Sequence, residues 1–145
     1  MDMNVFQGFL LNYLFVAFAS AWILSIIIKT ILTALTQKKN PDIRDGFHNG
    51  GMPSSHSTVV SAITAAIYFA EGFSPLFFVA LVFSLIIISD AFRLRYQVGL
   101  QGDALNKLLK KAKEKPLTVV YGHTLLQVMA GILLGIIVAA GIYLL

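Results

Sequence analysis

The 145-residue chain is 57% hydrophobic and only 12% charged, and its mean hydropathy is +0.79. Because soluble domains are about a quarter charged, this composition excludes an ordinary soluble domain and predicts a single membrane-embedded domain over residues 1–145. The sequence contains no cysteine, which excludes disulfides and thiolate metal sites.

Residues 5–28 form the first predicted membrane span, since a spanning helix takes about 20 apolar residues. The helical pattern can continue as far as Leu35. No basic residue precedes this stretch, and no small-residue cleavage motif follows it before Lys29. We therefore interpret it as a retained span and not as a signal peptide.

The second predicted span covers residues 57–70 and can be extended upstream to Ser54. It reads STVVSAITAAIYFA, and its small residues would allow close contact with other helices in a bilayer. We interpret it as a span buried among the others, with a re-entrant or interfacial helix as the alternative. The third span, residues 74–92, has Pro75 in its first turn, and the fourth covers residues 121–145.

All lysines and arginines lie in two clusters that flank these spans. With four spans, both clusters fall on one side of the membrane. The positive-inside rule then places them in the cytoplasm and both termini outside, and a bacterial-type plasma membrane is the expected compartment. Topology explains this charge, so nucleic acid is not an expected partner. The clusters are Lys29, Lys38, Lys39 and Arg44, and Arg93, Arg95, Lys107, Lys110, Lys111, Lys113 and Lys115.

Residues 99–116, in the second basic loop, carry an amphipathic helical pattern. Leu105, Leu108, Leu109 and Ala112 recur at helical spacing among lysines. The pattern predicts a short interfacial helix on the anionic inner surface, or equally a solvated basic helix. The predicted fold is therefore all-α, with about four transmembrane helices and one short amphipathic helix.

The clearest chemical motif is the loop from Gly50 to Ser57, which reads GGMPSSHS and leads into the second span. Glycines allow close approach of a ligand, and Ser54 or Ser55 can cap the helix. The first amides of a helix have no backbone partner and attract anions, above all phosphate. His56 lies in the first turn, where it could donate a proton to a bound phosphoester. A plain helix start with an incidental interfacial histidine is the alternative.

The segment Pro53-Ser54-Ser55-His56 resembles the Pro-Ser-Gly-His signature of the type 2 phosphatidic acid phosphatase superfamily. Its members are membrane lipid phosphatases related to vanadium haloperoxidases. Together with Asp90-Ala91 and Tyr121-Gly122-His123-Thr124, the segment resembles the small divergent branch of that superfamily over roughly residues 38–135. The resemblance implies that three motifs build one phosphate site, in which His56 is the general acid.

The resemblance also implies that His123 is the nucleophile and that the residue four positions later orients it. That residue is Gln127, where the superfamily has an aspartate. Glutamine can orient an imidazole through its carbonyl oxygen, but it cannot supply the negative charge that stabilises imidazolium. Asp90 could take this role, or it could form a structural pair with Arg93. Without the resemblance, His123 is equally well read as an interfacial helix-cap histidine.

The basic residues of the superfamily motifs are altered here. The first motif has a lysine, six residues and then Arg-Pro. In this chain Lys38 or Lys39 and Arg44 stand at a similar place, with Asp45 instead of the proline.

The arginine of the third motif, expected six residues before His123, is replaced by Leu117. Arg93 and Arg95 are therefore the candidates for clamping the phosphate, because guanidinium groups bind its oxygens bidentately. The candidate catalytic residues are His123, His56, Gln127 and Asp90, and the candidate substrate-binding residues are Lys38, Lys39, Arg44, Gly51, Ser54, Ser55, Arg93 and Arg95.

These residues and the resemblance predict metal-independent hydrolysis of a lipid phosphate, a monoester or diphosphate, at the cytoplasmic membrane face through a phosphohistidine. No cofactor and no metal are expected. A non-catalytic protein that binds or transports an anionic lipid with the same site is the alternative, and Gln127 keeps it open. A metallohydrolase using His48, His56 and nearby carboxylates would have irregular ligand spacing. A Ser–His–Asp hydrolase would lack a nucleophile elbow.

Sites in this superfamily are normally surrounded by six helices of one chain. Four spans and one interfacial helix make a thin wall, so we expect self-association, and specifically a dimer. The expected partners are therefore the lipid phosphate, the surrounding membrane lipids and a second copy of the chain.

Overall fold

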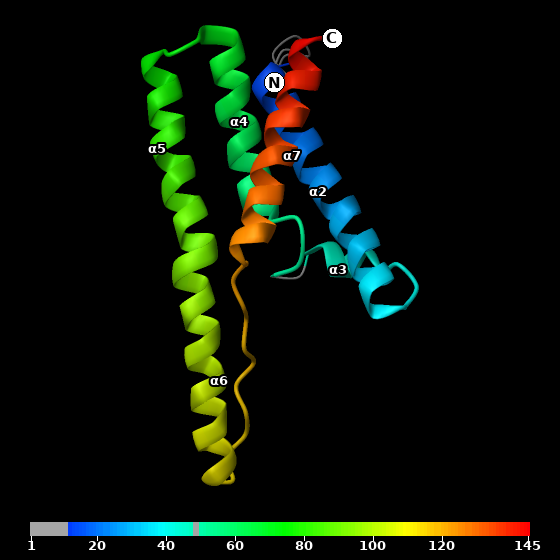
Figure 1. Ribbon diagram of the computed structural model, residues 1–145, viewed down its shortest axis with the longest axis vertical. Helices are drawn as coiled ribbons and strands as arrows, with labels where there is room; N and C mark the ends of the chain where they lie inside the picture. The colour runs from blue at the N-terminus through cyan, green and yellow to red at the C-terminus, as the bar shows by residue number, and fades with distance from the viewer. Residues whose placement is uncertain (1–11, 48–49) are drawn as a thin grey trace, which may run out of the picture.

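The computed structural model describes residues 12–47 and 50–145, and every regular element within them is helical, which confirms the predicted all-α class. The long helices form an up-and-down bundle in which successive members run in opposite directions (Figure 1). The elements are α2 (Tyr13–Gln37), α3 (Ile43–Phe47), α4 (Ser55–Glu71), α5 (Pro75–Ser89), the π-helical turn η1 (Asp90–Leu94), α6 (Arg95–Lys111) and α7 (Leu125–Tyr143).

In the described residues, three helical stretches are long and apolar enough to cross a membrane: α2, the continuous helix Pro75–Lys111, and α7. The fourth bundle helix, α4, has 17 residues, which at 1.5 Å per residue is about 25 Å. It packs against α2, α5 and α7 and lies between α5 and α2 in Figure 1. This central place agrees with the prediction that its small residues bury it among the other helices.

The first helix, α2, continues well past the predicted end of the first span. It begins at Tyr13, where the Asn12 side chain accepts a hydrogen bond from the Leu14 amide (3.0 Å), and it ends at Gln37. Lys29 therefore lies inside the helix, and only 4% of its surface is exposed. The stretch 5–11 of the predicted span lies outside the described residues.

Helices α4 and α7 are in backbone contact along a seam of small residues. A Cβ added at Gly131 would lie 2.6 Å from the Ser54 carbonyl oxygen, and one at Gly135 would lie 2.3 Å from that of Thr58. Glycines four residues apart let helices approach closely in a membrane. Because α4 and α7 run in the same direction (Figure 1), the seam holds their N-terminal ends side by side.

The third span continues without interruption into the amphipathic helix. The Arg95 amide bonds back to the Asp90 carbonyl, five residues earlier, and this π turn joins α5 to α6 in one helix of 37 residues. The sequence from Asp90 to Val98 contains no glycine or proline that would break the helix. The predicted amphipathic helix is thus present, but it extends beyond the bundle along the line of α5 (Figure 1) and is not a separate element.

An extended segment, residues 114–124, returns along α6 to the bundle. The Asn106 side chain exchanges two hydrogen bonds with the Leu117 backbone (2.7 and 2.9 Å), and the Tyr121 hydroxyl donates to the Asp103 carboxylate (2.6 Å). The last helix therefore begins at Leu125 and not at residue 121. As predicted from four spans, this segment and the α2–α4 connection lie at the same end of the bundle (Figure 1).

Candidate active site

Two capped helix starts meet at the end of the bundle from which α6 projects. At α4, the Ser54 hydroxyl accepts from the Ser57 amide (3.4 Å). At α7, Thr124 and Gln127 form a capping box, in which each side chain accepts from the other's backbone amide. The Ser54 amide also donates to the Gln127 carbonyl (3.1 Å). These bonds join the two helix ends that carry the predicted catalytic histidines.

His123 precedes α7 directly and is held against the π turn. Its amide donates to the Ala91 carbonyl (2.9 Å), and its surface is only 6% exposed. The preceding Gly122 has no room for a side chain, because a Cβ there would lie 2.5 Å from the Tyr96 nitrogen and 2.7 Å from the Ala91 oxygen. The backbone of His123 is therefore positioned by η1 as well as by α7.

The imidazole of His123 is held through Nδ1, which lies 3.1 Å from the Gly51 carbonyl oxygen and 3.3 Å from Gln127 Oε1. Gln127 Oε1 is itself an acceptor, since it receives the Thr124 amide (3.0 Å). Facing two acceptors, Nδ1 carries the proton, and Nε2 of the neutral ring keeps its lone pair. His123 and Gln127 thus meet as sequence spacing suggested, although the contact comes from the capping box and not from a shared helix face.

His123, His56 and Lys29 line one small cavity of about 120 Å³. His123 and Lys29 are buried, whereas His56 is exposed. Ser55 also lines the cavity, and its hydroxyl oxygen is buried without a hydrogen-bond partner in the part of the chain that the structure describes. The other lining residues are Trp22, Ile26, Gly46 and Phe47.

The size and charge of this cavity suit a phosphate group. One water molecule needs roughly 10–15 Å³ of cavity volume, so a cavity of about 120 Å³ can admit a group of several oxygen atoms. Lys29 contributes a positive charge, the N-terminus of α4 contributes a partial one, and the Ser55 hydroxyl is an available donor. Lys29 was not among the predicted site residues, although a lysine followed by a further apolar helical run is a readable signal of burial.

The surroundings of His123 favour its neutral form. Burial lowers the pKa of His123 below its usual value, and the positive charge of Lys29 lowers it further, while the hydrogen bonds to Gln127 and Gly51 act in the opposite direction. A neutral imidazole is the form in which Nε2 can act as a nucleophile.

Three predicted phosphate ligands from the first basic loop lie outside the cavity. Lys38, at the C-terminal cap of α2, is exposed. Lys39 pairs with Asp45 (2.8 Å), and Arg44 pairs with Asp42 (2.7 Å). The hydrogen bonds from Arg44 lower the pKa of Asp42 to about 2, so this pair stays ionised at neutral pH. Lys39 and Arg44 therefore pair with nearby carboxylates and not with the histidines.

The arginines after the third span are also directed elsewhere. Arg95 donates to the Asp90 carboxylate, so Asp90 pairs with Arg95 and neither with Arg93 nor with His123. Arg93 lines a separate hollow beside Gln97. Burial lowers the pKa of His56 below its usual value, and the positive charges of Arg95 and Lys29 lower it further, while the Asp90 carboxylate acts in the opposite direction. The remaining candidate metal ligand of the sequence, His48, lies outside the described residues.

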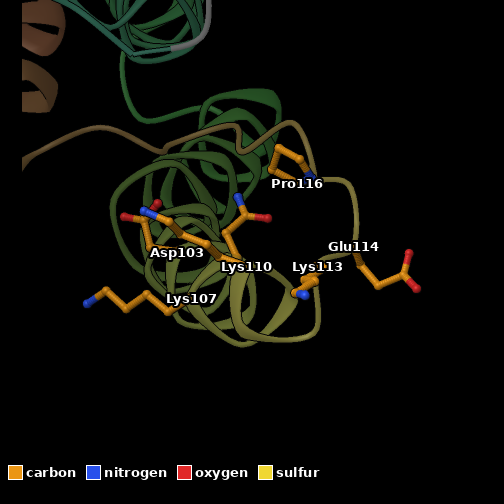
Figure 2. Close-up of a pocket in the computed structure, with 7 residues that line it drawn as sticks. Asp103, Lys107, Lys110, Lys113, Glu114 and Pro116 are labelled. Carbon is orange, nitrogen blue, oxygen red and sulfur yellow. The ribbon is translucent and has the colours of Figure 1, made fainter.

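Another hollow, of about 620 Å³, lies at the far tip of α6, away from the histidines. Figure 2 shows that its side chains spread outward, with Lys107 and Glu114 pointing in opposite directions. Polar groups converge in a binding site, so this hollow is a poor candidate. Its lining residues are Asp103, Asn106, Lys107, Lys110, Lys113, Glu114 and Pro116.

The helical bundle and its end cavity define a helical membrane protein with a cavity lined by two histidines. The chain belongs to the divergent PAP2 family, whose sequence pattern matches residues 10–138, and this confirms the predicted resemblance. It is similar to an uncharacterized membrane protein, YuiD, of Bacillus subtilis (strain 168), with 34% identity over 106 residues that cover 61% of this chain and 67% of the relative. No solved structure matches it.

Proposed function

We propose that the protein hydrolyses a lipid phosphate without a metal ion, through a phosphohistidine on His123. The observation that carries this proposal is the pair of acceptor oxygens beside His123 Nδ1. Gly51 and Gln127 favour Nδ1 as the donor, which leaves the lone pair on Nε2, and His123 lines a cavity together with Lys29 and His56. Membership of a branch of a phosphatase superfamily supports the same reaction class.

In the first step, His123 Nε2 attacks phosphorus and the bond from phosphorus to the ester oxygen breaks. Protonated His56 gives its proton to that oxygen, which leaves as an alcohol. In the second step, water attacks the phosphohistidine, and neutral His56 accepts the water proton. The Nε2–phosphorus bond then breaks, inorganic phosphate leaves, and both histidines return to their starting states.

Lys29 and Ser55 would stabilise the phosphate oxygens during these steps. Both line the cavity, one as a cation and one as a hydroxyl donor, and the first amides of α4 lie beside them. Charge on the equatorial oxygens is the main feature of phosphoryl transfer that a protein can stabilise. We therefore assign to Lys29 the role that sequence analysis gave to the loop arginines and lysines.

The substrate would approach from the cytoplasmic leaflet. Both basic connections lie at the end of the bundle that holds the cavity (Figure 1), and the positive-inside rule places such segments in the cytoplasm. The termini would then lie on the outer side.

A non-catalytic lipid-binding or transport protein is the second candidate, and one observation favours it. Gln127 is neutral, and within residues 12–47 and 50–145 no carboxylate is hydrogen-bonded to the His123 ring, so imidazolium formed during attack would lack a counter-charge there. The cavity would still bind a phosphate in this case.

Phosphate release from purified protein separates these functions. The protein would be given a panel of lipid phosphates with a chelator present, beside His123→Ala and His56→Ala. We expect release by the wild type and a loss of at least about a thousandfold in His123→Ala. Lipid binding by the wild type without any release would support the second candidate instead. Release that survives in His123→Ala would remove His123 as nucleophile.

The role of Lys29 is tested in the same assay by Lys29→Met, with Lys38→Met as the matched control. Charged hydrogen bonds are worth about 1.5–3 kcal/mol, so we expect kcat/KM to fall roughly tenfold to a hundredfold in Lys29→Met. Lys38 is exposed and outside the cavity, so its variant should stay near the wild type. Equal effects in both variants would contradict the assignment.

A further inference from the structure

A second, apolar hollow is joined to the histidine cavity. It has a volume of about 230 Å³, and it shares Trp22, Ser55 and His56 with the cavity. We call its apolar part the chain groove, which is lined by Phe18, Trp22, Val59, Val60 and Ile87.

The chain groove lies on the face of α4 that turns away from α7. The seam with α7 uses Ser54 and Thr58, which are four residues apart on one side of the helix. At 3.6 residues per turn, Val59 and Val60 lie close to the opposite side. Phe18 and Trp22 of α2 form one wall and Ile87 of α5 forms the other, so the groove passes between two spans.

The groove extends from the cavity toward the middle of the bundle. Along α4 it continues from His56 to Val60, and along α2 it continues from Trp22 back to Phe18, about 6 Å in each case. Phe18 and Trp22 stack with ring centroids 6.3 Å apart. A molecule whose charged end lies at His56 and Lys29 would therefore have its apolar end in this groove.

We propose that the chain groove holds the hydrocarbon chain of the phosphate-bearing lipid, next to its bound headgroup. This inference rests on the proposed function and names the substrate class: a phosphate carried directly on a long apolar chain or diacyl body, entering sideways between α2 and α5. Ile87 is then a specificity-determining residue, because it lines the chain groove and not the histidine cavity, whereas Trp22 lines both.

A second groove supplies the matched control. It lies between α4, α5 and α7, has a volume of about 330 Å³ and is also mainly apolar, but it includes none of the residues of the histidine cavity. Ile88 lines this control groove, whereas its neighbour Ile87 lines the chain groove. The two isoleucines are equally half-buried on the same helix.

The kinetic experiment compares Ile87→Trp with Ile88→Trp on two substrates. One is a long-chain phosphatidic acid in mixed micelles, and the other is glycerol phosphate, which has no chain. We expect Ile87→Trp to lower kcat/KM for the long-chain lipid about tenfold or more and to leave glycerol phosphate turnover unchanged. Ile88→Trp should change neither. An equal loss on both substrates in Ile87→Trp, or equal losses in the two variants, would overturn the proposal.

A binding measurement keeps the inference separate from the proposed function. Trp22 is the single tryptophan of the chain, so its fluorescence reports the groove without any turnover. Phosphatidic acid with brominated chains should quench Trp22 saturably, and unlabelled phosphatidic acid should reverse the quenching. Saturable quenching without phosphate release would support lipid binding in the chain groove and contradict the proposed hydrolysis. Bulk lipid causes quenching that rises linearly with lipid concentration. Phosphate release together with only this linear quenching would support the proposed hydrolysis and contradict lipid binding in the chain groove.

Discussion

Gln127 serves two structural purposes with one side-chain oxygen. Its Oε1 accepts the Thr124 amide at the start of α7 and also lies 3.3 Å from His123 Nδ1. Glutamate is the other common residue at this position of a capping box, whereas aspartate is one methylene shorter. The length of the side chain is therefore set by the helix cap, and the neutral amide leaves the imidazole without a counter-charge.

The pH dependence of the reaction should report on His123. Since burial and Lys29 lower its pKa, the neutral nucleophile persists below pH of about 6.5, the ordinary histidine value. We expect the acid limb of kcat/KM to lie below this value in the wild type. In Gln127→Glu the helix cap is kept and a carboxylate stabilises the imidazolium. The acid limb of kcat/KM should therefore shift to higher pH by about one unit or more.

The control for this shift is Gln127→Met, which is of similar length but offers no oxygen acceptor. Its acid limb should not move upward, and its kcat should fall about tenfold to a hundredfold because the ring loses an orienting partner. If the limb stays in place in Gln127→Glu, then Gln127 does not face His123 in the working protein.

For single residues, the sequence predicted the surroundings of the motif residues better than those of the basic residues. His56, His123 and Gln127 belong to short motifs with fixed spacing, and the structure brings their two helix ends together. The partners of Arg44, Arg95 and the loop lysines depend on which carboxylate the folded chain places nearby, and spacing does not carry that information. Lys29 was overlooked because it was read as the border of a span and not as part of its interior.

Among the elements, the α4–α7 seam sets the geometry of the site. Gly131 and Gly135 allow the two backbones to touch, and both helices begin at the cavity. A shift of either helix along or away from the other would separate His56 from His123. The precision of the site therefore depends on glycines that lie about two to three helical turns beyond His123.

Gly135→Ala tests this dependence. Its Cβ would lie 2.3 Å from the Thr58 carbonyl oxygen, so the helices must separate. We expect a loss of about 1–3 kcal/mol of stability, measured as a lower Tm in detergent, together with reduced phosphate release. Gly141→Ala, where the new Cβ meets no other element within 4 Å in the described part of the chain, should keep or slightly raise the Tm. Equal Tm values for the two variants would show that the seam is not tight.

The existence of the helices was predictable, but two of the relationships between them were not predicted. Hydropathy identified the apolar stretches, and Pro75 marked the start of α5. The continuation of α5 into α6 depends on the π turn, which no local pattern announced. The spacing of Gly131 and Gly135 was a readable signal of close helix packing that the sequence analysis did not use.

For the molecule as a whole, the charge distribution and the fold agree on one active end. The capped helix starts, the histidine cavity, the first basic loop and the α6 arm all lie at that end (Figure 1). The cytoplasmic orientation of this end and the dimer expected from the thin helical wall stay predictions. Cross-linking in mild detergent tests the dimer, since a purely monomeric protein would contradict it.

The shortness of α4 has a consequence for the lipids around the protein. Its 17 residues span about 25 Å, whereas the hydrocarbon core of a bilayer is about 30 Å thick. At the chain groove, where α4 lies open between α2 and α5, this hydrophobic mismatch would thin the adjacent leaflet and draw neighbouring headgroups toward the cavity. Reconstitution into bilayers of graded acyl length should therefore give faster phosphate release in thin membranes than in thick ones, and the bilayer itself would act as a regulator of substrate delivery.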